Sequence, residues 1–257
     1  MKYLIYSGWW CDNNHQSDKR NHYIGDDIIR DKLFHNKWFD CINKYTSPEK
    51  ILIVDSASPI KPDLFDDPRI EFLSLNKNFG HSTNHFGNMC GVTRAHLMGV
   101  YYAFLCDLDY CVYIEQDALI KGNLIVEEAI SKMTKPYMFG SGKGTPYATQ
   151  QSFFIIRKDG YMPFINRMSN FSSSCNQLAP ENKFAIASSS FLSKLPEFLF
   201  KLRGIGRILA YWPSFNKVPF GYGRTRPINF NDPFLYFQHG SIEELKHFDE
   251  TEANNIQ

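Results

Sequence analysis

The chain has 257 residues, of which 43% are hydrophobic and 21% are charged, a balance typical of a folded protein with a substantial core. Its formal net charge of +1 excludes the strongly basic surface that broad nucleic-acid binding requires. No stretch approaches the roughly 20 apolar residues of a membrane span, and the apolar run after Met1 is too short for a signal peptide. The six cysteines include no CxxC pair and are expected to be small buried hydrophobes in a reducing compartment. We therefore expect a cytoplasmic protein that at most rests on a membrane surface.

The first half of the chain alternates short apolar runs with helical periodicity. In chain order the pattern predicts a strand at 2–7, a helix at 26–45, strands at 51–54 and 71–75, a helix at 83–105 and a strand at 110–114. Continuously apolar runs such as 51–54 suit parallel strands that are buried on both faces. The order is that of a Rossmann-like α/β half, in which the carboxyl ends of the strands line one crevice.

The pattern loosens after residue 122. We expect a helix at 123–133, strands near 137–139 and 152–157, and a helix that begins at Pro180. No linker composition separates two domains, so 1–257 is predicted to be a single domain with halves at 1–122 and 123–249. The polar residues 250–257 are expected to be disordered.

Two carboxylates follow the predicted strand at 110–114, at Glu115 and Asp117. Acids that alternate with one intervening residue can both face a bound ion without competing for one position. Hard cations such as Mg²⁺ and Mn²⁺ prefer a few carboxylates together with phosphate oxygens. An acidic pair at a strand end is also a common solvated turn, so the pair alone leaves both interpretations open.

The segment Glu115-Gln116-Asp117 resembles the DxD region of GT-A glycosyltransferases. The stretch from Asn78-Phe79-Gly80 to Asn84 and Asn88 is similar to the residues that open the helix before DxD in these enzymes, and 51–56 is similar to their second strand. The resemblance covers about residues 2–122. It departs from the family pattern where Glu115 replaces an Asp.

The resemblance implies a GT-A fold with a mostly parallel central sheet flanked by helices, in which 1–122 binds a nucleotide sugar and 123–249 forms the acceptor side. It implies transfer from a nucleoside diphosphate sugar to a glycan or lipid-linked acceptor, in the synthesis of surface polysaccharide or glycoconjugate, with Mn²⁺ or Mg²⁺. The donor would contact five residues: Ser7, Asp55, Asn84, Glu115 and Arg224. Asp117 and His239 would bind the metal, and Asp117 is the more dependable ligand in the family.

Glu181, which follows Pro180 at a predicted helix start, resembles the position of the catalytic base in inverting members of the family. Such a base deprotonates the acceptor hydroxyl. A capping carboxylate favoured by the helix dipole explains the same residue without catalysis. Arg224 and Arg226 lie on a Gly-rich segment that could close over the donor diphosphate, because a guanidinium group forms paired hydrogen bonds with phosphate. A solvated basic loop explains the same two residues equally well.

Other segments suggest other functions. Residues 140–145 resemble the tail of a phosphate-binding loop, so one alternative is a P-loop nucleotide kinase that uses Lys143, although the leading glycine of that motif is absent. Because 16% of the residues are aromatic, a second alternative is a non-catalytic glycan-binding domain. The stretch 194–212 is basic and amphipathic, which suits either a core-packing helix or peripheral membrane contact.

Overall fold

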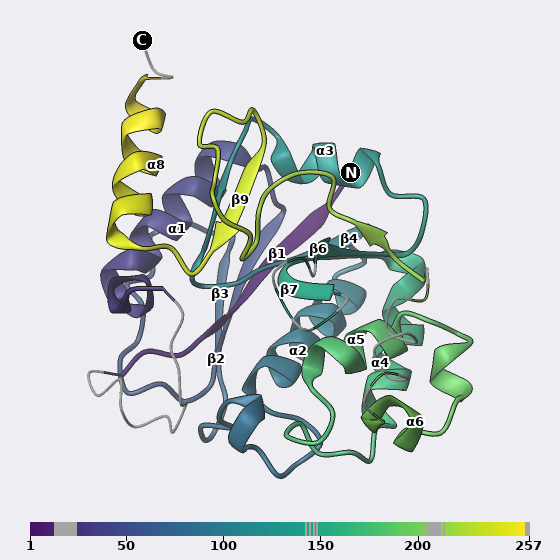
Figure 1. The fold of residues 1–257 in the computed structure, drawn as a ribbon. Coiled ribbons are helices and arrows are strands. Elements are labelled where there is room, and N and C mark those ends of the chain that lie inside the picture. Colours follow the sequence, from purple (N-terminus) through teal and green to yellow (C-terminus); the bar gives the residue numbers. More distant parts are fainter. Residues whose placement is uncertain are drawn as a thin grey trace.

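A computed structural model describes residues 1–12, 25–141, 149–202 and 214–254, together with positions 143, 145, 147, 204 and 212. Its centre is a seven-stranded sheet with the order β3-β2-β1-β4-β7-β6-β8 (Figure 1). The strands are β1 (Tyr3–Trp9), β2 (Lys50–Asp55), β3 (Ile70–Ser74), β4 (Tyr110–Ile114), β6 (Tyr137–Ser141), β7 (Thr149–Arg157) and β8 (Asn216–Lys217). Four neighbouring pairs are parallel and two are antiparallel. The expected α/β class with a mostly parallel central sheet is confirmed.

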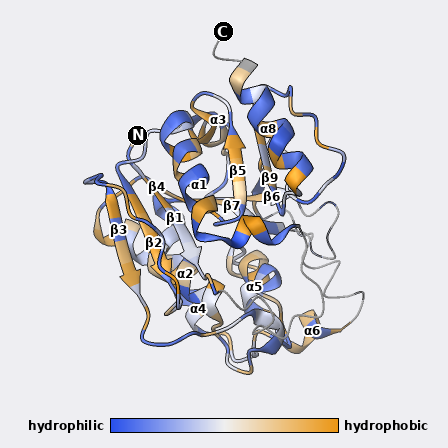
Figure 2. Cartoon of the chain, turned by 90° about the vertical axis from the view of Figure 1, so that its left-hand side faces the viewer, coloured by the Kyte–Doolittle hydropathy of each residue, from blue (hydrophilic) through white to orange (hydrophobic). Residues whose placement is uncertain are grey.

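Helices cover both faces of this sheet, because its inner strands are apolar on both sides. In β1, Tyr3 and Ile5 pack into one core cluster, and Leu4 and Tyr6 into the other. The first cluster is covered by α1 (Lys32–Tyr45), α3 (Ile125–Ser131) and α8 (Ile242–Asn254). The second is covered by α2 (Gly91–Leu105), α4 (Tyr161–Ser169), α5 (Pro180–Ala187) and α6 (Phe198–Lys201). In Figure 2, β3 and β5 (Ala118–Lys121) are coloured as hydrophobic, whereas the visible side of α8 is largely hydrophilic.

Two predicted helices begin later than their sequence pattern indicated. The segment 26–45 contains a 3₁₀ turn at Asp27–Arg30 and then α1, because Asp31 between them is extended, with ψ 155°. The segment 83–105 becomes helical only at Gly91 and has a 3₁₀ turn at Ser82–Asn84. In the loop that precedes α2, a polar side chain bonds to the backbone: Asn78 Oδ1 accepts the N–H of Gly80 at 2.7 Å. Such local bonds compete with helix formation.

A second, two-stranded sheet pairs a strand from the middle of the sequence with a strand near its C-terminal end. β5 (Ala118–Lys121) directly follows the acidic pair, and it pairs antiparallel with β9 (Leu235–Gln238). The helix α8 then packs beside α1, where Glu252 accepts hydrogen bonds from Tyr45 and, at 2.7 Å, from Lys44. The prediction of a disordered 250–257 is therefore wrong for 250–254, which are helical, and 255–257 lie outside the described residues.

The structure does not support the phosphate-binding loop. Lys143 lies between β6 and β7, which pair antiparallel with Ser141 opposite Thr149, so this segment connects a hairpin. A P-loop needs a helix whose N-terminal amides face the phosphate, and the described residues between these strands form none.

For the basic stretch 194–212 the sequence left open a core-packing helix or peripheral membrane contact. Within the described residues the structure has only a 3₁₀ turn at Leu192–Lys194 and the four-residue α6. Residues 203, 205–211 and 213 lie outside the described part. No helix among the residues that the structure describes is both long enough and apolar enough to span a bilayer.

The sheet order fixes where a ligand can bind. β1 lies between β2 and β4. After β1 the chain adds β2 and β3 on one side of it, and then crosses back to add β4 on the other side. A crevice forms at the carboxyl ends of strands where the order reverses in this way. The ends of β1, β2 and β4 therefore lie side by side at one edge.

Burial of His96 predicts that the protein loses stability in acid. The imidazole is fully buried, its Nδ1 lies 2.8 Å from the Tyr6 hydroxyl, and burial lowers its pKa to about 3. An unfolded chain binds this proton below about pH 6.5, so the folded state loses about 1.4 kcal/mol per pH unit from there down to the folded pKa. Urea unfolding at a series of pH values should show this slope reduced in His96→Gln. The exposed His247→Gln is the control with a wild-type slope, and parallel curves for all three proteins would contradict the assignment.

Candidate functional site

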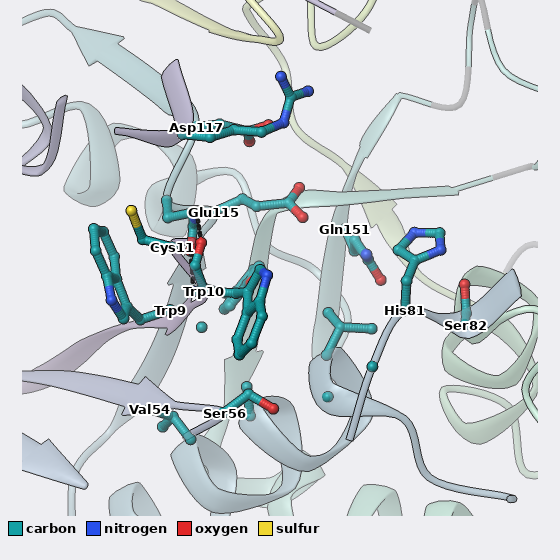
Figure 3. Close-up of a pocket in the computed structure, with 18 of the residues that line it drawn as sticks. Trp9, Trp10, Cys11, Val54, Ser56, His81, Ser82, Glu115, Asp117 and Gln151 are labelled. Atoms are coloured by element: carbon teal, nitrogen blue, oxygen red, sulfur yellow. Dashed lines mark hydrogen bonds between the residues drawn. The ribbon is translucent and has the colours of Figure 1, made fainter. Parts of the chain in front are cut away.

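A pocket of about 460 Å³ opens at the carboxyl edge of the inner strands (Figure 3). Its wall includes the end of β1, the residues that follow β2, the loop that precedes α2 and the turn after β4. Residues from the second half also contribute, namely Tyr147, Gln151, Glu181, Arg224 and His239. This volume lies within the range of small-molecule sites, which is about 300–1,000 Å³.

The turn that carries the acidic pair is tied to the end of β1 by one side-chain amide. Gln116 Oε1 accepts the N–H of Trp10 at 2.7 Å, and Gln116 Nε2 donates to the carbonyl of Trp10 at 3.0 Å. These two bonds satisfy a backbone donor and acceptor at the point where β1 ends. They leave the side chains on either side of Gln116 facing the pocket, and Figure 3 shows the Glu115 carboxylate pointing towards its middle.

Each acid of the pair has a partner from the end of β9. Glu115 Oε2 accepts a hydrogen bond from Gln238 Nε2 at 2.7 Å. Asp117 Oδ2 lies 3.2 Å from His239 Nε2. Asp117 is 8% exposed, and its other oxygen, Oδ1, is buried with no hydrogen-bond partner among the described residues. A buried carboxylate oxygen without a partner is costly unless a ligand completes it.

Gln238 and Asp117 both contact the same nitrogen of His239. The contact with Glu115 requires the NH₂ group of this amide to face the carboxylate, and the same NH₂ group lies 2.8 Å from His239 Nε2. When Nε2 is unprotonated it accepts from Gln238, and when it carries a proton it donates to Asp117 Oδ2 at 3.2 Å. In the unprotonated form, Nε2 and Asp117 Oδ2 are two electron-rich atoms side by side, which is favourable when a cation lies against both.

The donor atoms at this position fit a metal ion only in part. A carboxylate and a neutral imidazole suit Mn²⁺ or Mg²⁺ when phosphate oxygens complete the coordination. Among the described residues there is no cluster of three or more His, Cys, Asp or Glu side chains that could hold a metal by themselves. Asp117 and His239, with Glu115 beside them, could therefore hold a cation that a phosphate-bearing ligand also contacts.

Glu181 and Arg224 line the same pocket. Glu181 is at the start of α5, directly after Pro180. Burial raises the pKa of its carboxyl group, and the positive charge of Arg224 opposes that shift. Nε of Arg224 has no hydrogen-bond partner in the described part of the chain. A carboxylate with a raised pKa in a pocket is suited to accept a proton.

The two arginines of the Gly-rich segment differ in what they contact. Arg226 donates to Glu244 at 3.0 Å and to the carbonyl of Gln238 at 3.0 Å, so it fixes the chain after β9. Arg224 lines the pocket instead. The sequence left a phosphate contact open for both arginines, and of the two only Arg224 lines the pocket.

Three residues predicted to bind the donor are not part of the described pocket wall. Ser7 is buried in β1, and its hydroxyl lies 3.3 Å from the carbonyl of Gly8. Asp55 is fully buried and accepts hydrogen bonds from the N–H of Ser58 at 2.9 Å and from Ser74 at 2.5 Å. Asn84 is exposed in the 3₁₀ turn. Their near neighbours Gly8, Ser56 and Ser82 form the wall at these places.

The sequence analysis missed the two glutamines that organise the site. Gln116 lies between the two acids, and Gln238 precedes the histidine after the apolar run of β9. A buried Gln at the end of a strand is a signal in itself, because its amide needs partners. No local pattern indicates that those partners are Trp10 and Glu115.

Comparisons with known proteins give a fold likeness of low similarity. No model of a known protein family matches the chain, and no curated protein matches it. Among solved structures, it is similar to one from Desulfovibrio desulfuricans G20 that is named, provisionally, as a nucleotide-diphospho-sugar transferase. The identity is 12% and the TM-score 0.41, over 68% of this chain and 72% of the other. At this level the likeness adds nothing to the assignment of the site.

The amide of Gln116 should contribute measurably to stability. In Gln116→Ala the backbone N–H and C=O of Trp10 lose their partners, which we expect to lower the free energy of unfolding by about 1–3 kcal/mol. Gln151→Ala is the matched control, because Gln151 lines the same pocket and its Oε1 has no hydrogen-bond partner among the described residues. Urea denaturation measures both. Equal stabilities for the two variants would show that the Trp10 contact is not needed.

Proposed function

We propose that the protein is a glycosyltransferase that binds a nucleoside diphosphate sugar in this pocket and transfers the sugar to a hydroxyl group of an acceptor. The single observation that supports this most strongly is the pairing of Asp117 with His239, beside a carboxylate oxygen of Asp117 that has no hydrogen-bond partner among the residues the structure describes. The pair lies at the carboxyl edge of an inner strand, where α/β proteins bind nucleotides. A carboxylate of raised pKa, Glu181, and an arginine, Arg224, line the same cavity.

The nucleoside is proposed to bind at the end of the pocket near β2. The wall there combines an indole, Trp10, with polar groups of Ser56 and Asn78. An aromatic ring offers a stacking face for a base, and the polar groups offer hydrogen bonds that distinguish one base from another. The fully buried Asp55 lies beneath this wall, where its bond to Ser58 shapes the loop rather than reaching the ligand.

The diphosphate is proposed to lie between Asp117 and Arg224. A divalent cation held by Asp117 and His239 would offset the charge of the departing nucleoside diphosphate. Glu115 orients the site through its bond to Gln238, and Arg224 supplies a fixed positive charge on the other side.

Glu181 is proposed to be the base that removes the proton of the acceptor hydroxyl. Burial raises the pKa of its carboxyl group, which makes the carboxylate a stronger base once it is ionised. A base of this kind suits direct displacement at the anomeric carbon, in which the hydroxyl oxygen bonds to the sugar as the diphosphate leaves. We propose a glycan or a lipid-linked glycan as acceptor, in the synthesis of surface polysaccharide or glycoconjugate, and a cytoplasmic location.

The other two functions considered for the sequence are less well supported. A nucleotide kinase would require a phosphate loop at Lys143, which lies in a hairpin connection. A non-catalytic glycan-binding domain would present aromatic rings to solvent. Most of the large rings are buried in the two core clusters instead.

Ligand binding should depend on a divalent cation through Asp117. In wild type, a thermal-shift screen of nucleoside diphosphate sugars should show a larger stabilisation with Mn²⁺ than without it, and a ligand at 100 times its Kd adds about 2.7 kcal/mol. Asp117→Asn should weaken the Mn²⁺-dependent binding at least about tenfold. The control is Asp66→Asn, at an exposed position away from the pocket. If Asp117→Asn and wild type respond alike to Mn²⁺, Asp117 is not a metal ligand.

The pH dependence of transfer should report Glu181. Because burial raises its pKa, the acid limb of the wild-type kcat/KM profile should lie above the value of about 4.3 for an ordinary glutamate. Activity is lost below that pKa because the base is then protonated. Glu181→Gln should lower kcat by about 10²–10⁴-fold and remove the limb, whereas the exposed Glu243→Gln should behave as wild type. Full activity in Glu181→Gln would exclude it as the base.

A further inference from the structure

A fully buried lysine lies two residues after Glu181 on α5. Lys183 has no exposed surface, and its ammonium donates to the carbonyls of Asn88 and Ser173, each at 2.7 Å. The described part of the chain places no carboxylate within ion-pair distance of this ammonium. A buried ammonium that meets only neutral carbonyls is strongly unfavourable, so an anion is expected close by.

The candidate anion is the sulfur of Cys175. Lys183 Nζ donates to Cys175 Sγ at 3.6 Å, and the backbone N–H of Cys90 donates to the same sulfur at 3.3 Å. Thr93 Oγ1 lies 3.8 Å from it. The carbonyl of Asn88 is 3.3 Å from this sulfur, where it accepts the S–H of Cys175 if the thiol keeps its proton. The same carbonyl accepts from Lys183, so in the ionised form the ammonium lies against both the carbonyl oxygen and the sulfur.

The thiol groups of Cys90 and Cys175 are not equivalent. The neighbouring Cys90 thiol, its backbone N–H and the charge of Lys183 lower the pKa of Cys175, although burial opposes this. The neighbouring Cys175 and burial raise the pKa of Cys90, whose sulfur lies 3.2 Å from Thr93 Oγ1. Glu181 is the further titratable group that feels the charge on Cys175.

We propose that Cys175 is a thiolate at neutral pH, that it forms a buried ion pair with Lys183, and that this pair positions the helix that carries Glu181. The pair joins α5 to the loop that precedes α2. The N–H of Cys175 donates to the carbonyl of Gly87 at 2.8 Å, and Lys183 reaches Asn88 in the same loop. That loop leads directly into Gly91, which lines the pocket.

The positioning role depends on the proposed function, because it acts on the proposed base. The ion pair sets the position of the start of α5 relative to the donor side of the pocket. Its negative end also contributes to the raised pKa of Glu181, after burial as the main cause. Cys175 is thus a positioning residue that does not touch the substrate.

The thiolate can be tested without any substrate. The ultraviolet absorbance of thiolate at pH 7, measured as folded wild type minus Cys175→Ser, should correspond to one ionised sulfur. Because an ordinary thiol has a pKa of about 8.5, the signal should fall in urea-unfolded protein at the same pH. Cys106→Ser, at an exposed cysteine, is the control and should leave the signal unchanged. No difference between wild type and Cys175→Ser would overturn the proposal.

The ion pair and the positioning role have separate readouts. Lys183→Met, checked for folding by near-ultraviolet circular dichroism, should lose the thiolate signal, and full retention of the signal would overturn the pairing. Cys175→Ser should lower kcat about tenfold with donor KM unchanged and move the acid limb to lower pH. Wild-type kinetics in Cys175→Ser would overturn the positioning role. If wild type transfers no sugar, the proposed function fails, and the absorbance still decides the ion pair.

Discussion

The candidate site depends on the antiparallel pairing of β5 with β9. The register of this pairing places Gln238 opposite Ala118, and Ala118 is the residue that directly follows the acidic turn. One buried amide then contacts Glu115 and His239 at 2.7 and 2.8 Å. Without this pairing, the two acids would be a solvated turn of the kind that is common at strand ends. With it, segments more than 100 residues apart in sequence form one polar centre.

The same requirement applies to buried charged groups in the candidate site and in the region around Lys183 and Cys175. Buried polar groups are tolerated only where other groups satisfy them. Asp55 meets this requirement entirely within the protein, through Ser58, Ser74 and Lys61. Asp117 does not, because Oδ1 lacks a partner in the described residues. That contrast separates a structural carboxylate from a candidate binding carboxylate, although both follow buried strands.

The second polar region, around Lys183 and Cys175, lies behind the site rather than in it. It connects the helix that begins at Pro180 to the loop before α2, so it couples the two sides of the pocket through the interior. Two sets of contacts therefore hold the walls of the pocket in place. One is the pair of hydrogen bonds between the Gln116 amide and the Trp10 backbone, and the other is the proposed ion pair of thiolate and ammonium.

The sequence by itself determined the α/β class, the inner strands and the position of the acidic pair. These depend on local periodicity and on composition, which one segment carries alone. It also singled out Glu181, Arg224 and His239, which the folded chain brings to one pocket. Tertiary structure alone decided which of the remaining polar residues face that pocket, where α2 begins, and that the C-terminal residues are helical. Those outcomes depend on long-range contacts, such as the bond between Tyr45 and Glu252, that no local pattern encodes.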